Sequence, residues 1–173
     1  MASDLFGLGE TWLEPGEEKF FTDFKGAFSN HGRGKGVAAF YNSALDCIIL
    51  NSFTSDKFSA IHLSKETFDV VFVYLSAGCK KDEILCQLKQ WIDNERPTTI
   101  MGDFNINYKK EDKFIISLEK MGFSQLIEES TCDTGSIIDH IYINDAMKLL
   151  DINIQKDSAY YSDHDIITIN IPK

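Results

Sequence analysis

Three short polar motifs in this chain each follow an apolar run that is typical of a buried strand. They are GDFN at 102–105, SDH at 162–164 and ET at 10–11. Side chains placed where a strand gives way to a loop can meet at one edge of a sheet, even when they are far apart in the sequence. Carboxylate, amide and imidazole groups gathered in this way are suited to metal-assisted cleavage of phosphodiesters.

The GDFN motif supplies a carboxylate and an amide. Asp103 and Asn105 are two positions apart, so they share one face if the extended backbone continues, while Phe104 turns toward the core. The carboxylate can accept a proton from an attacking water, and the neutral amide can hold that water or a phosphate oxygen without repelling the anion. The alternative is a simple Asx turn, because Gly, Asp and Asn all favour turns. The motif alone leaves both interpretations open.

The SDH motif supplies a second unit. The imidazolium of His164 can donate a hydrogen bond to a phosphoryl oxygen as negative charge develops, and Asp163 can ligate a metal or, alternatively, cap a loop. Asp139 adds a third acidic group, and strand alternation places it on the same face as Ile141 and Ile143. Because a carboxylate among isoleucines needs a partner, we expect Asp139 to pair with His164 and fix its orientation.

Glu10 and Tyr74 complete the candidate site. Glu10 directly follows an apolar run, so a sheet edge would present it as an oxygen ligand for a hard cation. We predict magnesium, with Mn²⁺ as a substitute, because oxygen ligands without thiolates suit this cation. Tyr74 ends the apolar run 70–73, where its hydroxyl can contact a phosphate, although an ordinary half-buried tyrosine fits the pattern equally well.

Length and composition indicate one globular domain. The chain has 173 residues, of which 43% are hydrophobic and 25% charged, enough for a sizeable core. The 4 cysteines lack disulfide-framework or zinc spacing, which favours free thiols in a reducing compartment. No signal sequence is recognisable, and no run approaches the ~20 apolar residues that span a bilayer. We therefore expect an intracellular protein, nuclear or cytoplasmic, with no membrane partner.

The net charge of −10 argues against a nucleic-acid partner, because phosphate contacts depend on Lys and Arg. Carboxylates gathered at a metal site add negative charge, however, and bound cations neutralise it. Basic residues cluster in the Gly-rich stretch 26–36 and at 80–81 and 109–110, although each cluster also fits a solvated loop. DNA is the expected partner, and RNA is the alternative.

Hydrophobic periodicity and turn residues predict a mixed α and β fold. The predicted strands span 4–9, 37–41, 47–53, 58–63, 68–75, 98–101, 137–143, 150–155 and 166–171, and the predicted helices span 82–94 and 111–121. The second and third strands are expected to pair around a turn at 42–44, and the fourth and fifth around the next turn. Asp82 is the predicted N-cap of the first helix, and Gly122 is the stop signal of the second. Two packed sheets with helices outside fit this order.

Taken in order along the chain, these motifs resemble the endonuclease/exonuclease/phosphatase (DNase I-like) superfamily. The matching residues are Glu10-Thr11, Tyr74, the GDFN motif, IDHIY at 138–142 and the SDH motif. More narrowly, the stretches 9–13, 34–38 and 138–144 look like the endonuclease domains of non-LTR retrotransposons. The resemblance covers nearly the whole chain, and five motifs in collinear order make it specific.

The resemblance implies a four-layer α/β/β/α sandwich of two mostly antiparallel sheets and a magnesium-dependent phosphodiesterase, most specifically a DNA-nicking endonuclease. The roles that it implies are metal binding for Glu10 and Asp163, water activation for Asp103, water and phosphate binding for Asn105, transition-state stabilisation for His164, orientation of that histidine for Asp139, and phosphate contact for Tyr74. These roles agree with the chemistry argued from the residues themselves.

The beginning of the chain departs from the family pattern. Family members normally begin with a strand that ends in Asn and is followed by a helix, whereas this chain starts at the next strand, so an amino-terminally truncated fold is expected. The strand edge exposed there would favour pairing with a partner chain, including a second copy. Two alternatives to a DNA endonuclease follow: a weakly active or inactive domain that serves binding or assembly, and a phosphoesterase acting on RNA or small phosphoesters.

Overall fold

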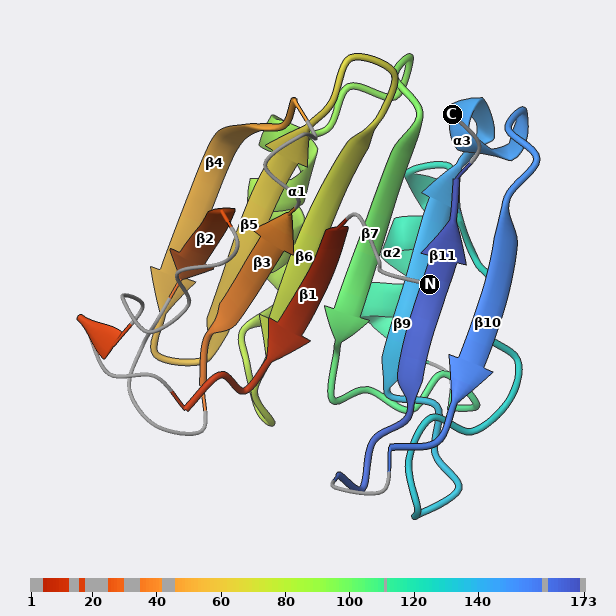
Figure 1. Cartoon of the computed structure of the whole chain (residues 1–173). Helices are drawn as coiled ribbons and strands as arrows, with labels where there is room; N and C mark the ends of the chain where they lie inside the picture. Colours follow the sequence, from red (N-terminus) through yellow and green to blue (C-terminus); the bar gives the residue numbers. More distant parts are fainter. Residues whose placement is uncertain are drawn as a thin grey trace.

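The computed structural model describes residues 5–12, 16–17, 25–29, 35–41, 46–110, 112–159 and 162–171. A six-stranded sheet forms the centre of this part of the molecule (Figure 1). In spatial order its strands are β4 (Ile48–Ser55), β5 (Phe58–Ser64), β6 (Asp69–Leu75), β7 (Thr98–Asp103), β9 (Asp139–Asn144) and β8 (Phe123–Gln125). The pairing of β6 with β7 is parallel, and the other pairs in this sheet are antiparallel.

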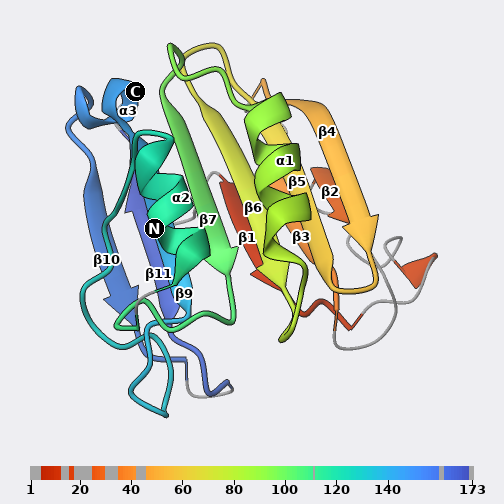
Figure 2. The same cartoon turned by 180° about the vertical axis from the view of Figure 1, so that it is seen from behind.

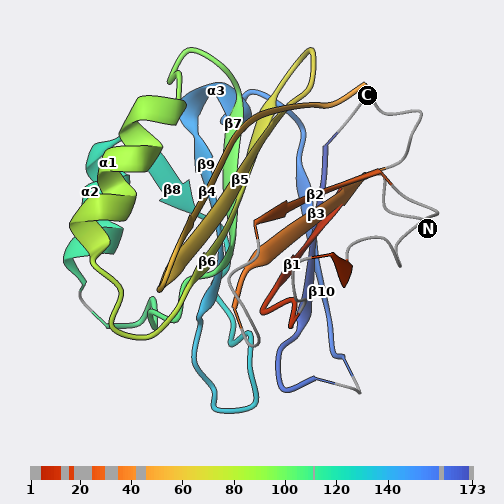
Figure 3. The same cartoon turned by 90° about the vertical axis from the view of Figure 1, so that its left-hand side faces the viewer.

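A second β layer packs against one face of the six-stranded sheet, and it consists of two separate sheets (Figures 1 and 3). The first has three strands in the order β1 (Leu5–Gly9), β3 (Val37–Tyr41) and β2 (Lys25–Ser29). The second has two strands, β10 (Asn153–Asp157) and β11 (Ile166–Asn170). All pairs in this layer are antiparallel.

Helices cover the other face of the six-stranded sheet (Figure 2). In α1 (Lys81–Trp91) and α2 (Lys113–Lys120) the apolar residues recur at helical spacing and form one buried face on each helix. Asp112 caps α2 by accepting a hydrogen bond from the Phe114 N–H, and Gly122 follows the helix with a φ of 89°. A third helix, the short α3 (Asp145–Lys148), begins at the end of β9.

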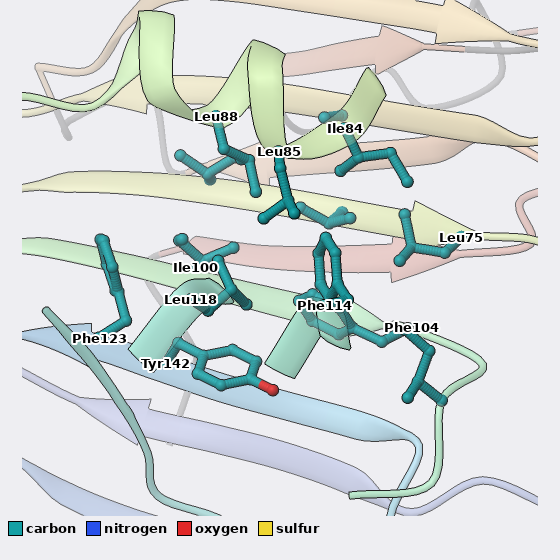
Figure 4. Close-up of a cluster of buried hydrophobic side chains, with 14 of the residues drawn as sticks. Leu75, Ile84, Leu85, Leu88, Ile100, Phe104, Phe114, Leu118, Phe123 and Tyr142 are labelled. Carbon is teal, nitrogen blue, oxygen red and sulfur yellow. The ribbon is translucent and has the colours of Figure 1, made fainter. Parts of the chain in front are cut away.

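The six-stranded sheet separates two apolar clusters, because alternate residues of its strands face opposite sides. On β9, Tyr142 points toward the helices, whereas Ile141 and Ile143 point toward the second β layer. Figure 4 shows the helix-side cluster, in which Leu88 and Leu118 meet side chains of the sheet. Central strands buried on both faces explain the nearly continuous apolar runs of the sequence.

Most of the predicted elements are confirmed, with ends that differ by a few residues. The predicted hairpin of 58–63 with 68–75 is the antiparallel pair β5–β6. Gly122 ends α2 as predicted. The first helix begins after Lys80, which makes no side-chain cap, so the prediction of Asp82 as N-cap is wrong; Asp82 lies in the first turn instead. Three short elements, β2, β8 and α3, were not predicted.

The predicted hairpin of 37–41 with 47–53 is wrong. In the structure β3 pairs with β1 and β2, while β4 pairs with β5 in the other sheet. The strand β3 is buried along its whole length, so it needs neighbours on both edges, and β1 and β2 supply them. The Gly-rich stretch 26–36, taken as a loop, contains most of β2, because Phe28 and its neighbours complete this smaller sheet. Residues 30–34 lie outside the described part, as does the predicted turn at 42–44.

The architecture is DNase I-like with one helical layer in the described residues. Helices lie outside the six-stranded sheet, but in the described ranges no helix covers the outer face of the second β layer (Figure 3). The prediction of a four-layer α/β/β/α sandwich is therefore corrected to α/β/β for this part of the chain. The amino-terminal truncation stays a prediction.

Among the residues that the structure describes, no helix has the length and apolar character needed to cross a membrane.

Candidate active site

The last residues of β6 and β7 and the first residue of β9 lie together where these strands meet the loops, and this edge of the six-stranded sheet presents the candidate residues side by side. In the parallel pair β6–β7, Tyr74 lies opposite Asp103. In the antiparallel pair β7–β9, Asp103 lies opposite Asp139. Residues in register on adjacent strands have side chains within contact range on the same face of the sheet. The sheet therefore brings two acidic residues and a tyrosine into one row.

Asn105 is held against Asp103 by a tight turn. Its backbone N–H donates to Asp103 Oδ1 at 2.8 Å, and its side-chain Nδ2 donates to Asp103 Oδ2 at 3.0 Å and to the Leu75 carbonyl at 2.8 Å. The backbone of Asn105 has a φ of 50°, which Asn tolerates better than most residues. The motif is thus an Asx turn that also holds the amide of Asn105 against the carboxylate of Asp103. Phe104 is buried on the other side, stacked on His140, as the sequence predicts.

The end of β1 brings Glu10 to this edge from the second β layer. The Tyr74 hydroxyl donates a hydrogen bond to Glu10 Oε1 at 2.9 Å. The end of β1 packs close to this row, because a Cβ at Gly9 would be in ordinary van der Waals contact with Tyr74 Cδ2, at 3.6 Å, and with Asp103 Cβ, at 3.7 Å. Burial and the hydrogen bond to Glu10 both raise the pKa of the Tyr74 hydroxyl, which therefore stays protonated as a donor. Glu10 itself is exposed at the mouth of the site.

His164 reaches the row from the loop that precedes β11. Its Nδ1 lies 3.0 Å from Asp139 Oδ2 and 3.2 Å from Asp139 Oδ1, so the predicted carboxylate–histidine pair is present. This bond assigns the proton to Nδ1 and leaves Nε2 for a further partner. Asp163 is exposed and adds its charge to the surroundings of His164.

The charges at this edge influence one another strongly. Burial, together with the negative charges of Asp139 and Glu10, raises the pKa of Asp103 to about 7. Burial also raises the pKa of Asp139, against the opposing effect of the His164 charge. For His164, burial lowers the pKa, but the charge and hydrogen bond of Asp139 outweigh it, so the pKa lies above its ordinary value. The edge therefore favours a cationic imidazole and carries more negative charge than it can neutralise by itself.

This excess negative charge fits a bound cation. The donors at the edge are carboxylate, amide and hydroxyl oxygens, the set that Mg²⁺ or Mn²⁺ prefers. The structure places Glu10 beside Tyr74 and Asp103, and it places Asp163 beside His164. Within the described ranges, however, no three or more Asp, Glu, His or Cys side chains converge in the geometry of a complete metal site. A cation here would depend on water and substrate oxygens for its remaining ligands.

Thr131 was missed by the sequence reasoning. It is completely buried, and its hydroxyl accepts hydrogen bonds from the backbone N–H groups of Ile138 and Asp139. It belongs to a polar stretch without periodicity, so no pattern in the sequence distinguishes it from an exposed loop threonine. Its sequence distance from Asp139 gives no hint that the two residues are in contact.

A DNase I-like sandwich with carboxylates, an amide and a histidine at one sheet edge defines the class of metal-dependent phosphodiesterases. Residues 2–164 match the model of the Endonuclease/Exonuclease/phosphatase family, and the chain belongs to this family. Members of the family typically use divalent metals. The suspected superfamily is therefore confirmed. No curated protein matches the chain closely enough to refine the assignment.

Several solved structures share the fold. The endonuclease domain of TRAS1, a telomere-specific non-LTR retrotransposon, superposes with a TM-score of 0.75 at 21% identity, covering 98% of this chain and 85% of that one. An AP endonuclease from Archaeoglobus fulgidus superposes with a TM-score of 0.73 at 13% identity, covering 97% of this chain and 88% of that one. A 3'-5' exonuclease from Neisseria meningitidis superposes with a TM-score of 0.70 at 18% identity, covering 97% of this chain and 89% of that one. At these identities the likeness establishes the fold.

Proposed function

We propose that this protein is a divalent-metal-dependent phosphodiesterase that nicks DNA. The observation that carries the proposal is the convergence of Asp103, Asn105, Asp139 and His164 at one sheet edge, with the contacts Asn105–Asp103 and His164–Asp139 already formed. This set supplies a proton acceptor, an amide that binds oxygen and an oriented cationic donor, which are the groups that hydrolysis of a phosphodiester requires.

Each side chain has a role that follows from its surroundings. The raised pKa of Asp103 matches a group that accepts a proton from water near neutral pH. Asn105 holds the carboxylate in place through its Nδ2, whose two protons bond Asp103 and the Leu75 carbonyl, and its Oδ1 is left to accept a hydrogen bond from the water. His164 donates from Nε2 to a phosphoryl oxygen, while Asp139 fixes the ring and favours its protonated form. Tyr74 orients the Glu10 carboxylate.

We assign Glu10 and Asp163 to the cation, because both side chains are exposed beside the candidate site. When bound, a divalent cation would polarise the phosphodiester and stabilise the charge that develops on it. The surplus of carboxylates around Asp103 is the feature of this chain that supports such an ion.

The first substrate to test follows from solved structures of proteins that share the fold. A structure of the Neisseria 3' phosphatase contains product DNA, and a D. rerio TDP2 structure contains single-stranded DNA product. We therefore infer DNA as the first substrate to test and RNA as the second.

Purified protein incubated with supercoiled plasmid and Mg²⁺ tests the proposal. The wild type should convert the plasmid to the open-circular form, and Asp103→Ala should not. Equal rates for wild type and variant would show that the conversion comes from a contaminant. If neither plasmid, single-stranded RNA nor bis-p-nitrophenyl phosphate is cleaved, the domain serves binding or assembly, which is the second candidate function.

Removing the proposed cation ligand should weaken metal binding. Glu10→Gln replaces one carboxylate oxygen by an amide and removes one negative charge, so we expect Mg²⁺ affinity to fall about 10-fold or more. Isothermal titration calorimetry measures the effect directly. Glu66→Gln, an exposed glutamate at the opposite end of β6, is the matched control and should bind Mg²⁺ as the wild type does. Equal affinities for Glu10→Gln and wild type would remove Glu10 from the metal site.

Ionisation of Asp103 should set the acid limit of activity. Only the carboxylate accepts a proton from water, so kcat/KM should rise with pH toward a plateau above the pKa of Asp103, which is about 7 without a cation. A bound cation favours the charged form and should move the midpoint to lower pH. Carbon-13 NMR titration of the Asp103 carboxyl in metal-free protein checks the pKa. A midpoint near about 4, the ordinary value for Asp, would contradict this prediction.

A further inference from the structure

Thr131 joins the two segments that carry Asp139 and His164, and none of the roles proposed above uses it. Its side chain is fully buried, with 0% of the residue exposed. A buried hydroxyl is costly unless it is hydrogen-bonded, so the contacts of this residue describe what holds it in place.

The hydroxyl of Thr131 binds the beginning of β9. Its Oγ1 accepts hydrogen bonds from the N–H groups of Ile138 and Asp139, each at 3.1 Å. A hydroxyl has two lone pairs and one proton, so accepting both bonds leaves the proton free to be donated. Burial raises the pKa of Asp139, and hydrogen bonding from Thr131 is one of the effects that lower it.

The main chain of Thr131 binds the segment that carries His164. Its carbonyl accepts a hydrogen bond from the Asp165 N–H at 2.9 Å. Two residues further on, the Asp133 N–H donates to the Asp163 carbonyl at 3.0 Å. Between these two bonds, Cys132 lies opposite His164 in an antiparallel bridge. The loop beginning at Thr131 therefore fixes the backbone on both sides of the histidine.

We propose that Thr131 is a positioning residue that sets the relative placement of Asp139 and His164, a role that rests on the proposed phosphodiesterase function. Through its hydroxyl it fixes the backbone of Asp139, and through its carbonyl it fixes the backbone next to His164. Loss of the hydroxyl frees the start of β9 while the main-chain bonds to the histidine segment remain.

Thr131→Val is the informative substitution, because valine keeps the shape and removes only the hydroxyl. It leaves the Ile138 and Asp139 N–H groups without their partner. We expect kcat to fall about 10- to 100-fold, the effect typical of a displaced partner of a catalytic group, with KM changed little. Thr131→Ser restores the hydroxyl and should keep kcat within about 3-fold of the wild type.

Thr99→Val is the matched control. Thr99 is equally buried, on β7, and its hydroxyl has no hydrogen-bond partner among the described residues. The same substitution there should leave kcat unchanged. If Thr131→Val fails to fold, Thr131→Ala, which leaves room for a water in place of the hydroxyl, takes its place in the comparison.

A double-mutant cycle and an NMR signal separate positioning from general damage. In a His164→Ala background, Thr131→Val should cost little further activity, because the pair that it positions is already broken. The Nδ1 proton of His164, hydrogen-bonded to Asp139, should give a downfield proton resonance in wild type and Thr131→Ser and lose it in Thr131→Val.

The NMR comparison needs no turnover, so it separates this proposal from the proposed function. A wild type that shows the resonance but cleaves nothing would overturn the phosphodiesterase alone. Thr131→Val with wild-type kcat and an intact resonance would overturn the positioning role alone. Additive losses of activity in the cycle would also overturn it, because they would mean that Thr131 acts independently of His164.

Discussion

Replacing His164 by alanine is expected to lower kcat by roughly 10³-fold, the cost of removing one preorganised donor to a developing oxyanion. The expectation follows from the geometry, since His164 Nδ1 is bound to Asp139 and its Nε2 is left to donate. Burial lowers the pKa of the imidazole, but the charge and hydrogen bond of Asp139 outweigh it and raise the pKa, which favours the cationic form that stabilises negative charge best. Steady-state cleavage of a labelled DNA duplex with saturating Mg²⁺ measures the effect.

The partner of the histidine provides the control for this prediction. Asp139→Asn should lower kcat by itself, because the amide no longer favours the protonated imidazole. Combined with His164→Ala it should add little, because the two residues act as one unit. Circular dichroism should show that all three variants are folded. A His164→Ala variant with kcat within about 3-fold of the wild type would remove the histidine from the catalytic groups.

Replacing Gly102 by alanine is expected to lower the free energy of unfolding by about 3–5 kcal/mol, which places it among the most severe single substitutions. Gly102 has a φ of 141°, and a Cβ there would lie 1.9 Å from the carbonyl oxygen of Val73, its neighbour on β6. The contact is with backbone rather than with the end of a flexible side chain, so relief requires the parallel pair β6–β7 to separate. Urea denaturation measures the loss.

Gly122→Ala is the matched control for steric contact. Gly122 also has a positive φ, of 89°, but a Cβ there would meet nothing within 4 Å. Gly122→Ala should lower the free energy of unfolding by only about 1 kcal/mol, which is the strain of a residue other than Gly in the left-handed backbone region. If the two variants lose the same amount of stability, the tight packing of β7 against β6 at Gly102 is not what makes this glycine necessary.

The proximity of the candidate residues could be predicted from the sequence because their side chains lie at strand ends. Alternation on β9 correctly separated Tyr142 from Ile141 and Ile143, and it left Asp139 where only a partner such as His164 could satisfy it. The pairing partner of Asp139 followed from the cost of burying a charge, which is a local argument. Arguments of this kind predict which buried polar groups must be hydrogen-bonded to each other.

Pairings that depend on distant segments could not be predicted. The strand β3 was assigned to its neighbour in sequence, whereas it pairs with β1 and β2. Of these two partners β1 was predicted as a strand, whereas β2 lies largely in a Gly-rich stretch that also suits a loop. Thr131 escaped notice for a related reason, because a buried threonine that accepts two N–H groups looks in the sequence like any loop residue. Hydrogen bonds between loops depend on the tertiary structure, and they produce no periodic pattern in the sequence.

The candidate site lies at the junction between two β layers. The six-stranded sheet contributes Asp103 and Asp139, whereas Glu10 and His164 arrive from the ends of the two smaller sheets opposite it. A small slide of one layer over the other would change the distances between these groups before it exposed much of the core. The rate of turnover should therefore be more sensitive to the relative position of the two layers than the melting temperature is.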